Sequence, residues 1–164
     1  MKRVATYLIV FALIVPLGVA PTACVGARGA GLGGAGDKED VAATAAKWAD
    51  AFSAETPDRI LALYDREAVL WGTLSPKRRD NPEAIRDYMV NAFKALPDHK
   101  VTFGDQLIRA YGDTAINSGY YTFTYNKDGE SKSLPARYSF VYAKRNGQWM
   151  IVDHHSSAMP VPPK

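Results

Sequence analysis

Apolar residues recur at helical spacing in three stretches of the first half of the chain. The first predicted helix opens at residues 37–40, where acidic side chains favour a helix N-terminus. Its apolar stripe consists of Val41, Ala45, Trp48 and Phe52. Thr56-Pro57 and Asn81-Pro82 each combine a capping residue with a proline at the first helical position. They predict a short second helix and a third helix that ends near Leu96.

The second half of the chain alternates apolar and polar residues with the period of a β-strand. Residues 68–71 predict one short strand, and the chain from residue 101 predicts about four long antiparallel strands. Asn146-Gly147 is a strong hairpin signal, because both residues tolerate positive φ angles. The prolines after Met159 end the last strand near Ser157 or Ala158. This order predicts an α+β fold, with about three N-terminal helices packed on one face of a curved antiparallel sheet.

The hairpin at Asn146-Gly147 also predicts a register for the last two strands. The predicted pairs are Arg145–Gln148, Tyr142–Ile151, Val141–Val152, Phe140–Asp153, Ser139–His154, Tyr138–His155 and Arg137–Ser156. Because side chains alternate between the two faces of a sheet, His155 is expected to share an apolar face with Tyr138. Arg137 and His154 are expected on the opposite face.

The N-terminal residues differ in composition from the rest of the 164-residue chain. Lys2 and Arg3 precede an apolar run at 4–20, which is typical of a secretory signal peptide. Pro16 and the length of the run argue against a permanent membrane span. The following stretch is rich in Gly and Ala and predicts a flexible tether. The predicted divisions are a signal peptide at 1–23, a tether at 24–36, a domain at 37–160 and a tail at 161–164.

Cys24 is the only cysteine, so it cannot form a disulfide within the chain. Its position directly after the apolar run resembles the lipobox of bacterial lipoproteins, in which the cysteine is lipidated and becomes the mature N-terminus. Cleavage after Ala23 or Ala27 without lipidation is the alternative. Both interpretations predict a protein exported by a bacterium, either periplasmic or anchored to the membrane only through lipid on Cys24.

The charge of the chain gives no argument for a nucleic-acid partner. The whole sequence carries a net charge of +3. Lys2 and Arg3 lie in the predicted signal peptide, which contains no acid, so the net charge falls to +1 without residues 1–23. A nearly neutral domain is not expected to bind nucleic acid.

Polar residues gather near the end of the last predicted strand, at residues 153–157. Adjacent histidines on a strand point to opposite faces, and no common zinc spacing is present, so neither a metal nor a cofactor is predicted. His155 is the candidate catalytic residue, because a histidine at the end of an apolar face can act as a general base. The alternative is a buried His155 that hydrogen-bonds to Ser157, Tyr138 or the backbone.

Three segments carry a resemblance to known proteins: residues 60–71, the Pro-Glu-Ala-Ile sequence at 82–85, and residues 146–160. They resemble the nuclear transport factor two-like superfamily. The closest resemblance is to bacterial proteins similar to the calcium/calmodulin-dependent protein kinase II association domain, with SnoaL-like families as neighbours. It implies a cystatin-like, cone-shaped sheet and helices that enclose a pocket. It also implies homodimers that form through the sheet and assemble into larger rings, without kinase activity or calmodulin binding.

The resemblance also implies a type of ligand, because the pocket of the kinase hub is rich in arginine for carboxylates. Where that family carries an arginine after the second of its spaced histidines, this chain has Ser156. Arg137 lies at a shifted position in the preceding strand, either as a ligand-binding residue or as an interface residue. The candidate ligand-binding residues are Arg137, Tyr138, His154, His155, Ser157, Tyr121 and Trp71.

Three function hypotheses follow from these observations. The first is an exported, oligomerising domain that binds a small polar or anionic ligand without catalysis. The alternative is a SnoaL-like cyclase, isomerase or hydratase that uses His155 as a general base and a tyrosine or Arg137 to polarise a carbonyl group. The third is self-assembly alone, with no ligand.

Overall fold

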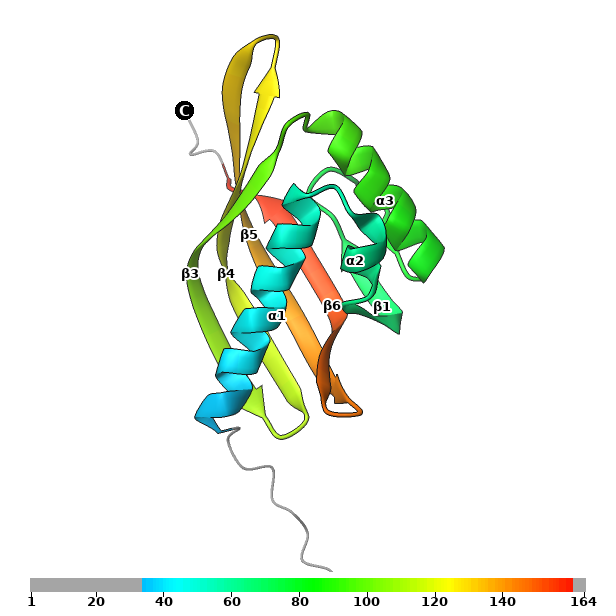
Figure 1. Ribbon diagram of the computed structural model, residues 1–164, viewed down its shortest axis with the longest axis vertical. Coiled ribbons are helices and arrows are strands. Elements are labelled where there is room, and N and C mark those ends of the chain that lie inside the picture. The colour runs from blue at the N-terminus through cyan, green and yellow to red at the C-terminus, as the bar shows by residue number, and fades with distance from the viewer. Residues whose placement is uncertain (1–33, 161–164) are drawn as a thin grey trace, which may run out of the picture.

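The computed structural model describes residues 34–160, which form three helices and one six-stranded sheet (Figure 1). The helices are α1 (Ala35–Ser53), α2 (Pro57–Leu61) and α3 (Pro82–Ala95). The strands are β1 (Tyr64–Trp71), β2 (Arg78–Arg79), β3 (Lys100–Tyr111), β4 (Thr114–Lys127), β5 (Glu130–Arg145) and β6 (Gln148–Ala158). The strand order is β2-β1-β6-β5-β4-β3. The predicted α+β class is confirmed, although the sheet is mixed, because β1 runs parallel to β6.

The local signals for the helices are largely confirmed. The Asn81 side chain caps α3 by accepting a hydrogen bond from the Ala84 backbone N–H at 2.9 Å. Thr56 does not cap α2, because its hydroxyl donates to the Ala51 carbonyl oxygen at 3.0 Å instead. The first helix begins at Ala35, inside the predicted tether. The predicted signal peptide and Cys24 lie outside the described residues, and no helix within residues 34–160 is long and apolar enough to cross a membrane.

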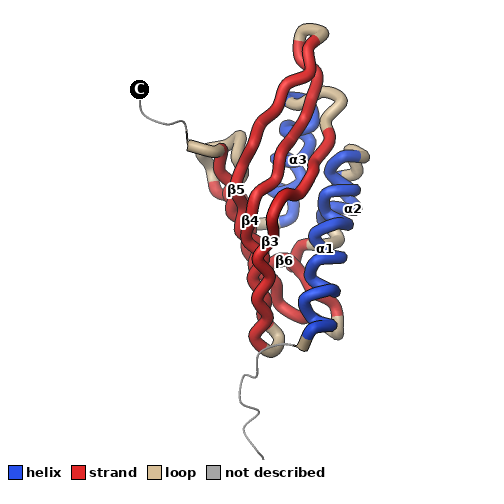
Figure 2. Tube along the Cα trace, turned by 90° about the vertical axis from the view of Figure 1, so that its left-hand side faces the viewer, coloured by secondary structure: helices blue, strands red, loops and turns tan. Residues whose placement is uncertain are grey.

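The helices cover only one side of the sheet (Figure 2). We name this covered side the inner face, and its buried side chains include Leu70, Ala115, Tyr121, Tyr138, Phe140, Trp149 and Ile151. The uncovered side is the outer face, and its side chains include Trp71, Leu107, Tyr120, Arg137 and His155. The predicted apolar stripe of α1 packs on the inner face, where Trp48 is 1% exposed and stacks on Phe52.

The predicted hairpin register is confirmed near the turn and wrong beyond it. Asn146 and Gly147 form the loop with φ angles of 50° and 81°, and Tyr142 pairs with Ile151 as predicted. The register then shifts by one residue, because Val141 pairs with Asp153 and leaves Val152 as a β-bulge. The later pairs are Phe140–His154, Ser139–His155, Tyr138–Ser156 and Arg137–Ser157.

This bulge exchanges the faces of the polar residues near the end of β6. His154 is 2% exposed and lies on the inner face opposite Phe140. His155 is exposed on the outer face. The predicted pairing of His155 with Tyr138 is therefore wrong, because it assumed unbroken alternation along β6, and a shift of one residue moves each later side chain to the other face.

His99 connects the C-terminal ends of α1 and α3. The buried ring of His99 lies between two backbone carbonyl oxygens, with Nδ1 2.7 Å from Leu96 and Nε2 2.8 Å from Phe52. Its ring also stacks on Phe93, with the centroids 5.3 Å apart. His99 thus ties the ends of the two helices together beside the cavity described below.

Candidate functional site

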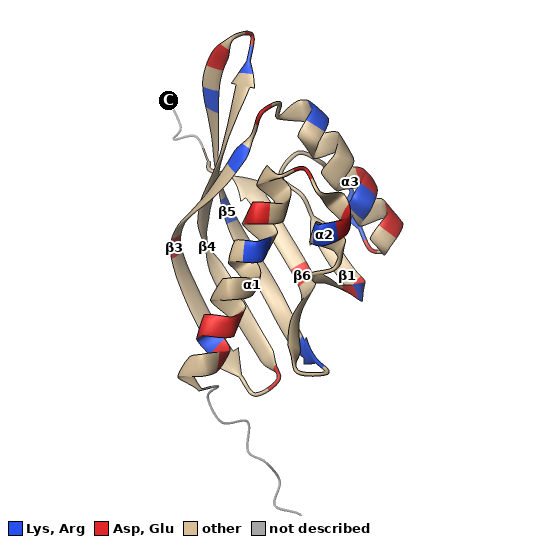
Figure 3. Cartoon of the chain, viewed as in Figure 1, with Lys and Arg blue, Asp and Glu red and all other residues tan. Residues whose placement is uncertain are grey.

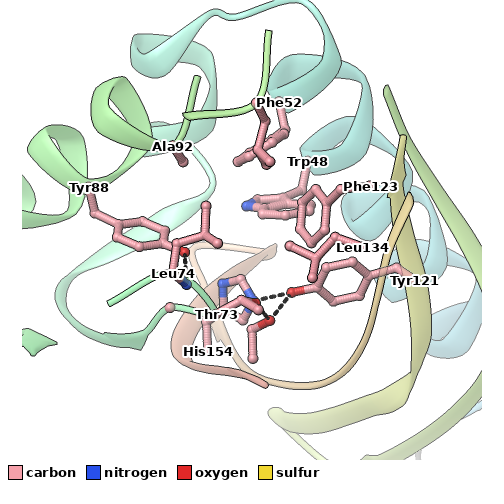
Figure 4. A pocket seen from close by; sticks show the side chains of 13 residues that line it. Trp48, Phe52, Thr73, Leu74, Tyr88, Ala92, Tyr121, Phe123, Leu134 and His154 are labelled. Atoms are coloured by element: carbon pink, nitrogen blue, oxygen red, sulfur yellow. Dashed lines mark hydrogen bonds between the residues drawn. The ribbon is translucent and has the colours of Figure 1, made fainter. Parts of the chain in front are cut away.

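A small cavity lies on the inner face, between the sheet, α1, α3 and the loop that follows β1 (Figure 4). Its volume is about 10 Å³, which is the space of roughly one water molecule. Its walls are mostly apolar and its floor carries hydroxyl groups and one imidazole. The lining residues are Trp48, Phe52, Gly72, Thr73, Leu74, Tyr88, Ala92, Leu96, Tyr121, Phe123, Leu134, His154 and Ser156.

His154 is held in the floor by a chain of hydrogen bonds that begins at α1. The Trp48 indole N–H donates to the Tyr64 hydroxyl oxygen at 3.1 Å. The Tyr64 oxygen lies 2.7 Å from Nδ1 of His154. Because the indole can only donate and Tyr64 is buried, the Tyr64 hydroxyl hydrogen is satisfied by pointing at Nδ1. His154 therefore accepts at Nδ1 and carries its hydrogen on Nε2.

The other side of the imidazole continues the chain toward the loop after β1. Nε2 of His154 lies 3.5 Å from the Tyr121 hydroxyl oxygen, so Nε2–H donates toward Tyr121. The Tyr121 hydroxyl donates to Ser156 Oγ at 2.5 Å. Ser156 Oγ in turn hydrogen-bonds to Thr73 Oγ1. A polar path thus runs from the buried indole to the loop beside the cavity mouth.

These buried groups are all neutral near pH 7. Burial, with a smaller contribution from nearby His155, lowers the pKa of His154 to about 3. Burial also raises the pKa of Tyr64 and of Tyr121 above the ordinary value of a phenol. The floor can therefore orient a ligand through hydrogen bonds, whereas a proton-accepting histidine would need a free lone pair and a higher pKa.

The mouth of the cavity is closed by Leu74 and Tyr88. The Leu74 backbone N–H donates to the Tyr88 hydroxyl at 3.3 Å. Gly72 is required beneath this contact, because a Cβ added there would lie 2.1 Å from the Tyr88 ring. The Leu74 side chain is 43% exposed although it lines the cavity, so it forms the outermost part of the wall.

The sequence-predicted site residues are divided between the two faces. Tyr121 and His154 meet in the cavity, and Tyr138 is buried on the inner face, where its hydroxyl donates to Asn117 at 3.0 Å. The others are Arg137, His155, Ser157 and Trp71, and all four lie on the outer face. Arg137 donates to Ser157 Oγ at 3.1 Å and is exposed.

Sequence reasoning missed several cavity residues. Trp48 was expected only as core, and Ser156 was expected on the opposite face. Thr73 and Tyr88 were not singled out, and their positions follow from the fold rather than from a local pattern. No three His, Cys, Asp or Glu side chains within residues 34–160 converge on a point where a metal ion could bind. Both nitrogens of His154 already face hydroxyl oxygens of the protein.

The outer face carries large apolar side chains that residues 34–160 leave uncovered. The exposed fractions are Leu107 61%, Tyr120 52%, Tyr111 43% and Trp71 43%. Arg109 and Arg137 lie on the same face, and on the helix side of the molecule charged side chains gather on the helices and near the strand ends (Figure 3). Such a face on a sheet whose other side is fully packed is typical of a protein–protein interface.

Comparisons with known proteins agree with this architecture. A Xanthomonas campestris structure, named for the calcium/calmodulin dependent protein kinase II association domain, is 37% identical, with a TM-score of 0.67 over 74% of this chain and 86% of that one. A Novosphingobium aromaticivorans structure that is named as an aromatic ring hydroxylase is 21% identical, with a TM-score of 0.68 over 76% of this chain and 91% of that one. A cystatin-like protein from Nostoc punctiforme is 19% identical, with a TM-score of 0.69 over 79% and 96%. No curated protein matches the chain.

The two more distant structures support the fold alone, which is the cystatin-like fold of nuclear transport factor two-like proteins. The family can be stated more narrowly. The chain belongs to the calcium/calmodulin dependent protein kinase II association domain family, whose model matches residues 37–160.

Proposed function

We propose that this protein is a self-associating domain whose subunits pair through the outer face of the sheet. The observation that carries the proposal is the group of exposed apolar side chains on that face, led by Leu107 and Tyr120. These two lie on β3 and β4, and Trp71 lies on the same face on β1, separated from them by His155 on β6 and Ser139 on β5. The name of the family, an association domain, supports the same conclusion.

Charge substitutions on the outer face test this proposal. Leu107→Glu and Tyr120→Lys each place a charge within the proposed interface, where desolvation would cost several kcal/mol, of the order known for a buried unpaired ion. Lysine is used at position 120 because Arg137 lies directly opposite and would pair with a glutamate. Ala46→Glu is the matched control for Leu107→Glu, because Ala46 is exposed on α1 and the substitution adds the same charge on the helix side. Light scattering after size-exclusion chromatography should give a dimer or larger ring for the chain and for Ala46→Glu, and a monomer for the other two variants. A monomeric wild-type chain at micromolar concentration would refute the proposal.

A second function, binding of a small ligand, is favoured by the inner cavity. Apolar walls with a few fixed polar groups are the usual construction of small-molecule sites. The enzyme hypothesis receives less support, because Nδ1 of His154 accepts from Tyr64 and Nε2 carries the hydrogen. His155, the base proposed from the sequence, lies on the outer face and does not line the cavity. The expected anionic ligand is likewise not matched by a charged side chain in the lining.

We also propose that the protein is exported. The predicted signal for export lies within residues 1–33, outside the described part of the chain. The supporting pattern is the charged start, the apolar run and Cys24. Mass spectrometry of the protein made in a bacterial host tests it. A mature chain that begins at lipidated Cys24 indicates a lipoprotein, and an unmodified chain that begins after Ala23 or Ala27 indicates a periplasmic protein. An intact Met1 would contradict export.

A further inference from the structure

The lining of the cavity restricts the chemical class of its ligand. Its walls are formed by aromatic and aliphatic side chains from α1, α3, β4 and β5. None of the lining residues is Asp, Glu, Lys or Arg, and the imidazole of His154 is neutral in its hydrogen-bonded state. Moving a charged group into such a site without a partner is strongly unfavourable. The body of a ligand in this cavity is therefore apolar and uncharged.

The direction of the hydrogen bonds restricts the polar end of the ligand. Along the series of hydrogen bonds that runs from Trp48 through Tyr64, His154 and Tyr121 to Ser156, each donor hydrogen already points at the next acceptor. Either hydroxyl can donate in the contact between Ser156 Oγ and Thr73 Oγ1, and in the arrangement that continues the chain of hydrogen bonds Ser156 donates to Thr73. The Thr73 hydroxyl hydrogen is then left over. It can turn back to the nearby Tyr121 oxygen when the cavity is empty and to an acceptor when the cavity is filled.

A second hydroxyl at the mouth, that of Tyr88, can also act as a hydrogen-bond donor. The Tyr88 oxygen accepts from the Leu74 backbone N–H, which leaves the Tyr88 hydroxyl hydrogen without a partner among residues 34–160. Tyr88 lies against Gly72, next to Thr73 in the chain. The hydroxyl groups of Thr73 and Tyr88 are thus two donors beside the mouth of the cavity.

We infer that the cavity binds an uncharged, mainly apolar molecule that carries one hydrogen-bond acceptor, such as a ketone or aldehyde oxygen, which accepts from Thr73. This inference rests on the proposed ligand-binding function of the same cavity. The apolar body lies against Trp48, Phe52 and Phe123, where aromatic rings already pack on one another. The acceptor of the ligand faces Thr73 at one end of the series of hydrogen bonds, and the indole N–H of Trp48 lies at the other end. Binding is therefore expected to change the environment of that N–H.

A ligand can occupy the cavity only when its outer wall moves, since the closed space holds about one water molecule. Leu74 is the side chain to move, because it is 43% exposed and a single contact of its backbone, 3.3 Å long, ties it to Tyr88. Leu74→Ala removes this part of the wall without touching Thr73. The variant should bind probe molecules more tightly than the wild-type chain.

Three probes of similar shape test the inference: acetophenone, ethylbenzene and benzoate. Binding is followed by NMR through the indole N–H resonance of Trp48, which is assigned by its loss in Trp48→Phe. With the Leu74→Ala chain, acetophenone should bind roughly three- to tenfold more tightly than ethylbenzene, the ratio that one net hydrogen bond provides. Benzoate should not bind detectably.

Substitution of Thr73 separates the hydrogen bond from the shape of the cavity. Thr73→Val keeps the volume and removes the hydroxyl, so in the Leu74→Ala chain it should abolish the preference for acetophenone and leave ethylbenzene binding unchanged. Thr73→Ser should retain the preference. If Thr73→Val fails to fold, Ser156→Ala interrupts the chain one step earlier and should lower the preference.

The outcomes distinguish this inference from the proposed function on which it rests. If no probe binds to the wild-type or the Leu74→Ala chain, the ligand-binding function itself fails. Equal affinities for acetophenone and ethylbenzene would show that the cavity binds ligands, but would refute the inference that the ligand carries a hydrogen-bond acceptor for Thr73. Tighter binding of benzoate would also overturn it and would point to Arg79, whose guanidinium lies near Tyr88 with a buried Nε that has no partner in the described residues.

Discussion

His154 and His155 are neighbours in β6, yet the two faces of the sheet give them different surroundings. His154 lies on the inner face, 2% exposed, between the hydroxyls of Tyr64 and Tyr121. His155 lies on the outer face beside Trp71, in contact with solvent. The same residue type is therefore a neutral hydrogen-bonding group on one face and a solvated surface group on the other. The comparison shows that the face, and not the residue type, decides which chemistry is available.

Two tryptophans give the largest expected contrast between the faces. Trp48→Ala removes a fully buried ring and the donor to Tyr64, so it should lower the free energy of unfolding by about 4 kcal/mol. Trp71→Ala on the outer face should change it by less than about 0.5 kcal/mol. Urea unfolding of both variants, made in the Leu107→Glu chain that is expected to be monomeric, measures the difference. Similar losses for both tryptophans would mean that the outer face is not open in the monomer.

His154 should couple the stability of the fold to pH. Burial lowers the pKa of His154 from 6.5 to about 3, so the unfolded chain takes up a proton there before the folded chain does. Stability from this group is complete above pH 6.5 and falls as the pH drops toward 3. The loss between pH 6.5 and pH 4.5 is about 2 kcal/mol, because the slope approaches 1.36 kcal/mol for each pH unit only once the unfolded chain is mostly protonated.

Substitution by glutamine tests this coupling. His154→Gln should flatten the dependence of the unfolding free energy on pH between 6.5 and 4.5 relative to the wild-type chain. The protein concentration is kept constant, because association also contributes to the measured stability. An unchanged slope in His154→Gln would contradict the assignment of His154 as a buried, neutral imidazole on the inner face.

Local signals in the sequence were sufficient to predict the elements other than the two-residue strand β2, but not the assignment of residues to faces. Asn81-Pro82 and Asn146-Gly147 specify a cap and a turn through their own backbone preferences, and both are confirmed. The bulge at Val152 has no such signal. β6 pairs with β5 on one side and with β1 on the other, and its pairing with β1 also shifts between Tyr64 and Val69. The register of β6 thus depends on contacts distant in sequence, which a hairpin rule cannot include.

The cavity shows the same limit. Tyr121 and His154 could be named from the sequence because they stand in long strands with aromatic neighbours. Thr73 and Tyr88 belong to a loop and a helix whose distance from β6 is set only by the packed fold. Their hydroxyl groups therefore become recognisable as part of a site only when the inner layer is assembled.

Adjacent residues in β4 give a smaller contrast. Asn117 is fully buried on the inner face, donates to Gln106 Oε1 at 2.8 Å and accepts from the Tyr138 hydroxyl at 3.0 Å. Asn117→Leu should cost about 2 kcal/mol, because it leaves the buried Tyr138 hydroxyl without a partner. Ser118→Ala on the outer face should be nearly neutral. Thermal and urea unfolding compare the two, and Tyr138→Phe added to Asn117→Leu should recover part of the loss. If it recovers nothing, the cost of Asn117→Leu comes from packing and not from the hydrogen bond.

Arg137 should give the smallest effect, although the sequence marked it as a ligand-binding residue. Its side chain is exposed on the outer face and donates to Ser157, so the sheet separates it from the cavity on the inner face. Arg137→Ala in the Leu74→Ala chain should change the affinity for acetophenone less than twofold and the unfolding free energy by less than about 0.5 kcal/mol. Thr73→Val provides the positive control for a change in affinity. A clear loss of acetophenone binding in Arg137→Ala would show that the two faces are coupled, and the outer face would then belong to the site rather than to assembly alone.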